Sequence, residues 1–171
     1  AIPDAERKNL DDYKRIAEKF NSIGAEAKKE GIRFGYHNHG YGLNNVNGVM
    51  PLDIIFDQTD PSLVYFEMDL YWTIAGVADP VELFKKHKDR YKMVHIKDMK
   101  EPKRFSGDGG NSSQWIPLFP YMTSCGEGIL DLPTILTTAK QNGVEHFFVE
   151  QDTVQSPEIA LKKSIDYLKS L

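Results

Sequence analysis

The sequence predicts a protein of the α/β class, built from parallel (β/α) units. Two observations lead to this fold class: amphipathic helical segments alternate with short strands, and those strands are apolar at nearly every position, as in sheets covered on both faces. The chain has 171 residues, 40% of them hydrophobic and 27% charged. That length and composition suffice for one buried core, so we expect a single domain over residues 1–171.

The helices follow from periodicity and from helix-start signals. Apolar residues recur at three- and four-residue steps over residues 3–29, which predicts one long amphipathic helix ended by Gly31. Four later helices carry a proline in their first turn, where a missing N–H costs nothing: Pro51, Pro80, Pro133 and Pro157. The helix after Pro80 is expected to reach about Arg90. The apolar face of the closing helix is expected to comprise Ile159, Leu161, Ile165 and Leu168.

Four apolar segments are predicted strands, and a polar residue stands where each one ends. The strands cover residues 32–36, 63–68, 91–97 and 146–150. Between the last two lies an irregular stretch, residues 99–128, rich in Gly, Ser and Pro. Loops of this length usually carry function, so we interpret it as a functional loop with a short strand near residues 121–123.

The polar residues at the strand ends are candidate metal ligands. They are His37, Asp69, His95 and Glu150. In a parallel α/β barrel the carboxyl ends of the strands form one rim, where active sites are built. Two imidazoles and two carboxylates form a mixed nitrogen and oxygen set that suits Mn²⁺, Zn²⁺, Co²⁺ or Fe²⁺. The alternative for each residue is a helix cap or a solvent-facing side chain.

Composition excludes several other classes. The formal charge is -4 and the basic residues are scattered, which argues against nucleic-acid binding. Cys125 is the only cysteine, so the chain can form no internal disulfide. Apolar runs are far shorter than a membrane span, which predicts a soluble protein. Residues 1–4 show no leader, and the chain leaves open the cytoplasm or the periplasm, and a homo-oligomer.

Several motifs, in this order and spacing, resemble the xylose-isomerase-like TIM barrels, the sugar (phosphate) isomerase/epimerase group. They are His37-Asn38-His39 after a strand, Met68-Asp69-Leu70-Tyr71-Trp72 followed by Ala75-Gly76 and Asp79-Pro80, His95-Ile96-Lys97-Asp98, Gly126-Glu127-Gly128-Ile129-Leu130-Asp131, and Val149-Glu150-Gln151-Asp152. The resemblance covers nearly the whole chain from about residue 30 and corresponds to the C-terminal part of the family.

The resemblance implies a ligand set and a partial barrel. Relatives commonly hold a divalent ion with Glu, Asp, His and Glu, and His37 stands here in the place of the first Glu. Trp72 stands where several epimerases carry a further His. A closed barrel takes about 250 residues, so we expect four or five of its eight strands, with an open sheet edge or a missing N-terminal portion.

The resemblance also implies metal-dependent sugar isomerase or epimerase chemistry through an enediolate. We expect Glu150 to be a ligand that doubles as general base, and His39, two residues from His37, to be a second acid or base and a substitute ligand. Lys97 would stabilise an oxyanion or phosphate, or else pair with Asp69 or Asp98. The aromatic residues expected to wall the sugar site, unless they belong to the core, are Tyr41, Trp72, Trp115 and Phe119.

Two other functions stay open on the same residues. The first is a lyase or dehydratase that acts on an inosose or a 3-keto-sugar with the same metal site, which His37 favours because it removes one of the paired glutamates. The second is a non-catalytic binding protein that keeps the fold alone. Binding of a divalent ion and the identity of the product would distinguish the three.

Overall fold

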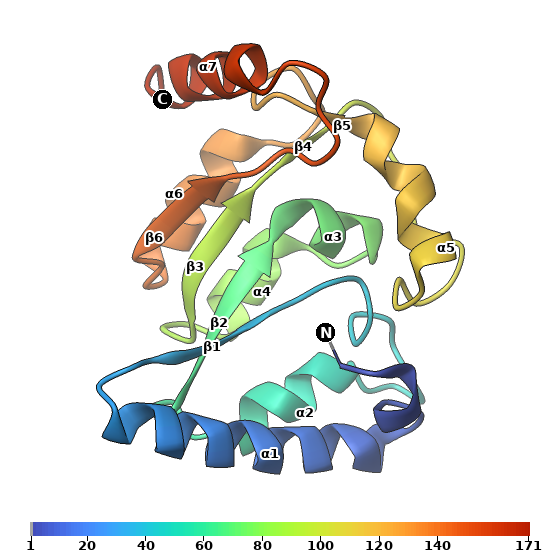
Figure 1. The fold of residues 1–171 in the computed structure, drawn as a ribbon, viewed down its shortest axis with the longest axis vertical. Helices are drawn as coiled ribbons and strands as arrows, with labels where there is room; N and C mark the ends of the chain where they lie inside the picture. Colours follow the sequence, from blue (N-terminus) through green and yellow to red (C-terminus); the bar gives the residue numbers. More distant parts are fainter. Residues whose placement is uncertain (1) are drawn as a thin grey trace.

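The computed structural model describes residues 2–171 and contains a four-stranded parallel sheet in the order β1-β2-β3-β6. The strands are β1 (Phe34–His37), β2 (Val64–Asp69), β3 (Tyr91–Ile96) and β6 (His146–Val149). Figure 1 shows them side by side with their arrows pointing the same way. The predicted α/β class and the partial barrel are therefore confirmed, with four parallel strands.

Helices connect the strands and cover one face of the sheet. They are α1 (Leu10–Lys29), α2 (Pro51–Gln58), α3 (Leu70–Ala75), α4 (Pro80–Lys86), α5 (Ser112–Trp115), α6 (Leu132–Gln141) and α7 (Pro157–Leu168), with short 3-10 helices η1 (Asp4–Glu6) and η2 (Ile116–Tyr121). Strand side chains that point to this face, such as Val64, Phe66 and Val94, share one core with α1, α2 and α6.

Two predicted helix boundaries were wrong. The first long helix begins at Leu10 because Asn9 caps it: the Asn9 side chain accepts from Asp12 N, and the Asp12 carboxylate accepts from Asn9 N. Helix α4 ends at Lys86, well before Arg90, because Asp89 takes a left-handed φ of 64° that no helix can continue.

In the middle of the chain the short strand predicted near residues 121–123 is present, whereas helix α3, strand β4 and the short helices α5 and η2 were not predicted. Helix α3 begins directly after Asp69. The short strand in the irregular stretch is β5 (Met122–Thr123), and it pairs antiparallel with β4 (Asp98–Met99), so it is no barrel strand. The rest of that stretch contains the short helices α5 and η2.

Within residues 2–171 no helix covers the second face of the sheet, which corrects the expectation that both faces are covered. Tyr65, Met93 and Phe148 lie on this face and are partly or largely exposed, Phe148 to 47%. Strands β1 and β6 are the two edges of the sheet, and each pairs with one neighbour only. The expected open edge is therefore present, on both sides of the sheet.

Helix α7 lies across the end of the sheet to which the strands point (Figure 1). It buries Ala160 and Ser164, whereas Ile159, Leu161 and Ile165 of its predicted apolar face are exposed. The prediction was wrong for these three residues and right for Leu168, which packs partly buried against the core together with Tyr167.

A buried carboxylate organises the turn before α6. Asp98 is fully buried, and its Oδ1 accepts from Met99 N at 2.8 Å and from Leu130 N at 3.2 Å. Its Oδ2 accepts from Gly126 N at 3.0 Å and from Gly128 N at 3.1 Å. These four bonds fasten the Gly-Glu-Gly turn against β4, and a Cβ at Gly128 would lie 2.1 Å from Asp98 Oδ1.

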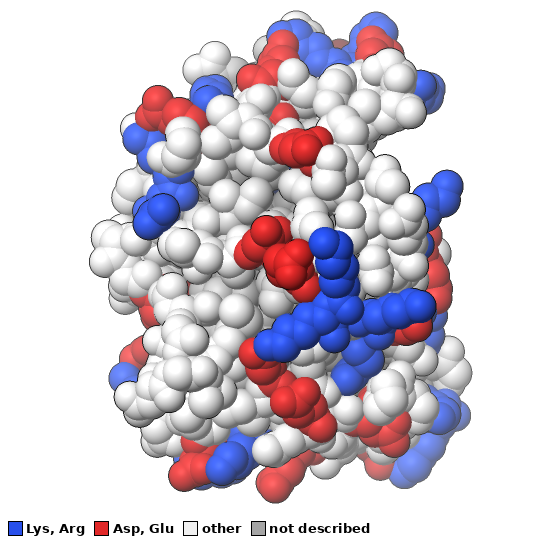
Figure 2. All heavy atoms as spheres, turned by 180° about the vertical axis from the view of Figure 1, so that it is seen from behind, with Lys and Arg blue, Asp and Glu red and all other residues white. Residues whose placement is uncertain are grey.

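The surface carries charges of both signs close together. Figure 2 shows Lys and Arg side chains flanked by Asp and Glu on the back of the molecule. Many of these pairs lie three or four residues apart on one helix, as Lys85 does with Glu82, and such exposed pairs contribute little to stability. Among residues 2–171, no helix has the length and apolarity needed to cross a bilayer.

Candidate metal and substrate site

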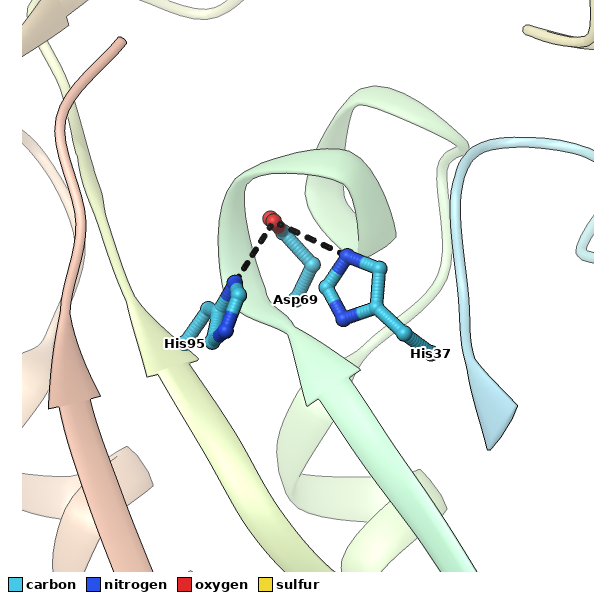
Figure 3. A group of neighbouring side chains, drawn as sticks. All are labelled: His37, Asp69 and His95. Atoms are coloured by element: carbon cyan, nitrogen blue, oxygen red, sulfur yellow. Dashed lines mark ion pairs between the residues drawn. The ribbon is translucent and has the colours of Figure 1, made fainter. Parts of the chain in front are cut away.

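The carboxyl ends of three neighbouring strands bring His37, Asp69 and His95 together. Figure 3 shows both imidazoles turned toward the Asp69 carboxylate. Asp69 Oδ2 lies 3.7 Å from His37 Nε2 and 3.9 Å from His95 Nδ1. One atom from each residue falls within a group no wider than 4.8 Å, which is compact enough to surround a single ion.

Asp69 is held by its own backbone surroundings. Its Oδ1 accepts from Trp72 N at 2.9 Å and so caps helix α3, while its N–H donates to Asn38 Oδ1 at 3.3 Å. Its Oδ2 is buried and accepts no hydrogen bond from the described residues. Burial raises the pKa of Asp69 to about 6, against the opposing charge of Lys97.

Glu150 follows β6 and closes the group on its fourth side. Its Oε2 contacts His95 Nδ1 and lies 3.0 Å from Lys97 Nζ. The bond with His95 and the charge of Lys97 outweigh its partial burial and lower the pKa of Glu150 to about 2. The structure therefore brings the four predicted ligands together, and their roles as ligands stay predictions.

Lys97 lies among carboxylates and is only 3% exposed. Its Nζ donates to Asp152 Oδ2 at 2.8 Å and lies 3.1 Å from Asp69 Oδ2. Burial opposes its charge, but Asp69, Asp152 and Glu150 together raise the pKa of Lys97 above its ordinary value. Of the two pairings predicted for it, the one with Asp69 forms and the one with Asp98 does not.

The pKa values of the two imidazoles of the group are shifted in opposite directions. Burial and the nearby charges of His95, His39 and Lys97 lower the pKa of His37 to about 3, so this ring is neutral near neutral pH. Burial also acts on His95, but contacts with Glu150, Glu67 and Asp69 outweigh it and raise the pKa of His95. A neutral imidazole is the form that binds a metal.

His39 lies beside this group, with its ring centroid 5.3 Å from that of His37. It is stacked between Tyr41 and Trp72, at centroid distances of 6.4 and 6.5 Å. Its Nδ1 is buried and has no hydrogen-bond partner in the described chain. Burial, with the charge of Lys97, lowers the pKa of His39.

A cavity of about 400 Å³ opens over these groups. It is lined by His37, His39, Trp72, His95, Lys97, Trp115, Phe119, Glu150 and Asp152. Three of the four aromatic residues predicted to wall a sugar site lie here; Tyr41 does not, because it is buried behind His39 and its hydroxyl accepts from Ile2 N. The volume suits a small polar molecule with one apolar side.

Sequence reasoning missed two acidic residues of the site, Glu67 and Asp152. Glu67 contacts both His37 and His95, and Asp152 bonds to Lys97. Glu67 stands two residues before the predicted ligand Asp69, and Asp152 stands two residues after the predicted ligand Glu150. Residues two apart on a strand share a face, so the spacing from Asp69 places Glu67 on the same face but does not by itself assign it to the site, and Asp152 lies in the turn after β6.

The residues present fit a divalent cation. Three carboxylates, on Asp69, Glu150 and Asp152, surround the ammonium group of Lys97. A fourth carboxylate, on Glu67, lies against the imidazoles of His37 and His95. Asp69 Oδ2 is fully buried at the centre of the group, where it pairs with the Lys97 ammonium at 3.1 Å and lies between the two imidazoles. Nitrogen and carboxylate donors in this combination are those preferred by Zn²⁺, Mn²⁺, Co²⁺ and Fe²⁺.

The fold and this rim of side chains define a (β/α)-barrel protein with its site at the strand ends. The chain belongs to the xylose isomerase-like TIM barrel family, whose model matches residues 2–171. The predicted resemblance is thereby confirmed.

Among curated proteins, the chain is similar to inosose dehydratases. It is 30% identical over 154 residues to that of Clostridium perfringens, covering 89% of this chain and 50% of the relative. It is 29% identical over 156 residues to that of Bacillus licheniformis, with 88% and 49% covered. The chain thus spans about half the length of the curated relatives it matches.

Two solved structures are similar to this chain in fold. A sugar phosphate isomerase/epimerase from Parabacteroides distasonis is 28% identical, with a TM-score of 0.78 over 99% of this chain and 55% of its own. The IolI protein, solved with a bound zinc atom, is 16% identical, with a TM-score of 0.71 over 96% of this chain and 58% of its own. At that identity the second likeness shows the fold alone.

Proposed function

We propose that this chain carries the metal-binding and proton-transfer site of a sugar (phosphate) isomerase or epimerase that acts through an enediolate. The convergence of His37, Asp69, His95 and Glu150 at one rim of the sheet is the observation that carries the proposal. The proposal concerns the complete protein. The relatives that match this chain are about twice as long as the part that is matched.

The proposed ligands are His37, Asp69, His95 and Glu150, and the substrate is a sugar or sugar derivative in the adjoining cavity. A divalent ion bound there would polarise a carbonyl and a neighbouring hydroxyl of that sugar, which acidifies the C–H bond between them. His37 is suited to its role because it is neutral near neutral pH, and Asp69 because its Oδ2 lies between the two imidazoles at 3.7 and 3.9 Å.

His39 is the proposed carrier of the proton. Its ring lines the cavity, and its lowered pKa leaves it unprotonated and able to accept a proton. Glu150 was predicted to be a ligand that doubles as the general base. With a pKa of about 2 it is a weak proton acceptor while it contacts His95 and Lys97, so its role as a ligand has the better support.

Lys97 is the proposed stabiliser of negative charge on the substrate. Its ammonium group lines the cavity and is anchored by Asp152. Because Lys97 is charged and almost fully buried, its hydrogen bond to an oxyanion would be stronger than the same bond in water.

Dehydration of an inosose is the second candidate, and the similarity to inosose dehydratases favours it. The first step, removal of a proton next to a carbonyl, would be the same. A dehydratase then expels a hydroxyl from the neighbouring carbon, and protonated His39 is placed to donate to that leaving group.

The test uses the complete protein with Mn²⁺ or Zn²⁺, a panel of ketoses, inososes and 3-keto-glucosides, and D₂O as solvent. Deuterium entering the carbon next to the carbonyl supports the proposal, and product analysis separates isomerisation from loss of water. His39→Gln should lower turnover about 10²–10⁴-fold, whereas the control His146→Gln, at the far end of β6, should not. Turnover without solvent exchange would overturn both candidates.

A further inference from the structure

Glu67 lies directly behind the two imidazoles of the site. It stands two residues before Asp69 on β2, so both carboxylates point to the same face of the sheet. In the sheet register Glu67 is the partner of His37, and Asp69 is the partner of His95. Strand β2 therefore places two carboxylates, on Glu67 and Asp69, one after the other between the imidazole rings of its two neighbouring strands.

Glu67 contacts both rings at once. Its Oε2 lies 3.2 Å from His37 Nδ1, and its Oε1 lies 3.3 Å from His95 Nε2. The side chain is 17% exposed and, within residues 2–171, forms ion pairs with these two imidazoles only. Its charge is thus committed to the site and serves no pairing elsewhere in the described chain.

Each ring turns one nitrogen toward Glu67 and the other toward Asp69. For His37 the nitrogen facing Asp69 is Nε2, and for His95 it is Nδ1. An ionised carboxylate accepts protons in hydrogen bonds and donates none. Glu67 lies 3.2 and 3.3 Å from the nitrogens it faces, whereas Asp69 Oδ2 lies 3.7 and 3.9 Å from the other two. The nearer carboxylate keeps the proton on the nitrogen beside Glu67, which leaves the nitrogen beside Asp69 with a free lone pair.

We propose that Glu67 is a positioning residue that fixes His37 and His95 in opposite tautomers, protonated at Nδ1 and at Nε2 respectively. This inference rests on the proposed metal site and deepens it. Each imidazole then presents an unprotonated nitrogen to the same point, beside Asp69 Oδ2. A ring in the wrong tautomer would point an N–H at that position and could not bind a cation.

Both contacts of Glu67 are ion-pair contacts, and the two rings differ in their other surroundings. His37 Nδ1 is buried at ion-pair distance from Glu67 but outside hydrogen-bond alignment. His95 has carboxylates at both nitrogens, because Glu150 contacts its Nδ1. A cation at the site would compete with the Nδ1 proton of His95, and the proton at Nε2 would remain with Glu67.

The test compares Glu67→Gln with wild type in the complete protein. Glutamine keeps the size but offers one oxygen and one NH₂ group, so only one ring retains an acceptor. Two quantities are measured: Zn²⁺ affinity by competition with a chelator, and the tautomers of both histidines by ¹⁵N NMR of the imidazoles, at mildly alkaline pH and with Zn²⁺. The control is Glu145→Gln, which pairs with Lys92 and Arg33 away from the imidazoles.

We expect opposite tautomers in wild type, a changed tautomer for one ring in Glu67→Gln, and Zn²⁺ affinity lowered about 10–100-fold in that variant only. Identical tautomers of the two rings in wild type, or unchanged affinity and tautomers in Glu67→Gln, would overturn the inference; the wild-type measurement decides even where the variant does not fold. Wild type that binds no Zn²⁺ but shows tautomers set by Glu67 would refute the metal site of the proposed function and leave the positioning role intact.

Discussion

The buried carboxylate of Asp98 offers the most direct test of how the loop beside the site is held. Replacing Asp98 with Asn changes one oxygen into an NH₂ group and removes the negative charge. One oxygen bonds to the N–H groups of Met99 and Leu130, and the other bonds to those of Gly126 and Gly128. Whichever way the amide turns, two of the four backbone N–H groups lose their acceptor and face another donor.

The expected loss follows from these two bonds. A hydrogen bond to a charged group contributes about 1.5–3 kcal/mol, so the loss of two predicts a destabilisation of about 3–6 kcal/mol. The site offers no easy compensation, because Asp98 is fully buried. The loss is a large share of the ~5–15 kcal/mol by which a domain is stable.

The assay is urea unfolding followed by circular dichroism, together with hydrogen exchange of the Gly126 and Gly128 amides, which should become faster. Asp131→Asn is the matched control. Asp131 caps α6 with one bond, to Thr134 N at 3.2 Å, and Asn caps a helix as well as Asp, so a change within about 0.5 kcal/mol is expected. A loss below about 1 kcal/mol for Asp98→Asn would refute the reasoning.

Three further predictions concern binding, strain and pH. Asp69→Asn keeps the cap of α3 but removes the central anionic donor, so Zn²⁺ affinity measured by chelator competition should fall more than the ~100-fold typical of losing a supporting residue; unchanged affinity would exclude Asp69 as a ligand. Val77 is 59% exposed with φ at 65°, so Val77→Gly should raise the free energy of unfolding by about 0.5–1 kcal/mol, whereas Ile32→Gly, outside the left-handed region, should lower it. Burial lowers the pKa of His87 below 6.5 in the folded chain, despite its bond to Asp53. Below pH 6.5 the unfolded chain therefore binds more protons than the folded chain, and the free energy of unfolding falls as the pH drops. His87→Gln should flatten this pH dependence in urea titrations, whereas the exposed control His146→Gln should not.

The sequence predicted the helix and strand alternation because each strand is apolar and ends in a polar residue at one rim. Helix α3 was not predicted because nearly all its residues are buried, so its sequence lacks the alternation of apolar and polar residues that marks an amphipathic helix. The pairing of β4 with β5 depends on a tertiary contact between two-residue strands far apart in the chain. No local pattern encodes such a contact.

The residues of the site likewise divide into those that a local sequence pattern predicts and those that depend on tertiary contacts. His37, Asp69, His95 and Glu150 were found because each follows an apolar run and the runs are parallel. Glu67 lies inside its strand, where alternation alone cannot tell an acidic residue of the site from one facing solvent. Its significance appears only with the register that pairs β1, β2 and β3.

The strand order of the sheet has a consequence for how the chain folds during synthesis. Every parallel strand pairs with the parallel strand before it in the sequence, so each can dock on a neighbour that has already emerged from the ribosome. The side chains gathered at the rim arrive one strand at a time, and Glu150 comes last. A cation that needs all four would bind only after β6 has docked, and its retention would mark chains whose sheet is assembled.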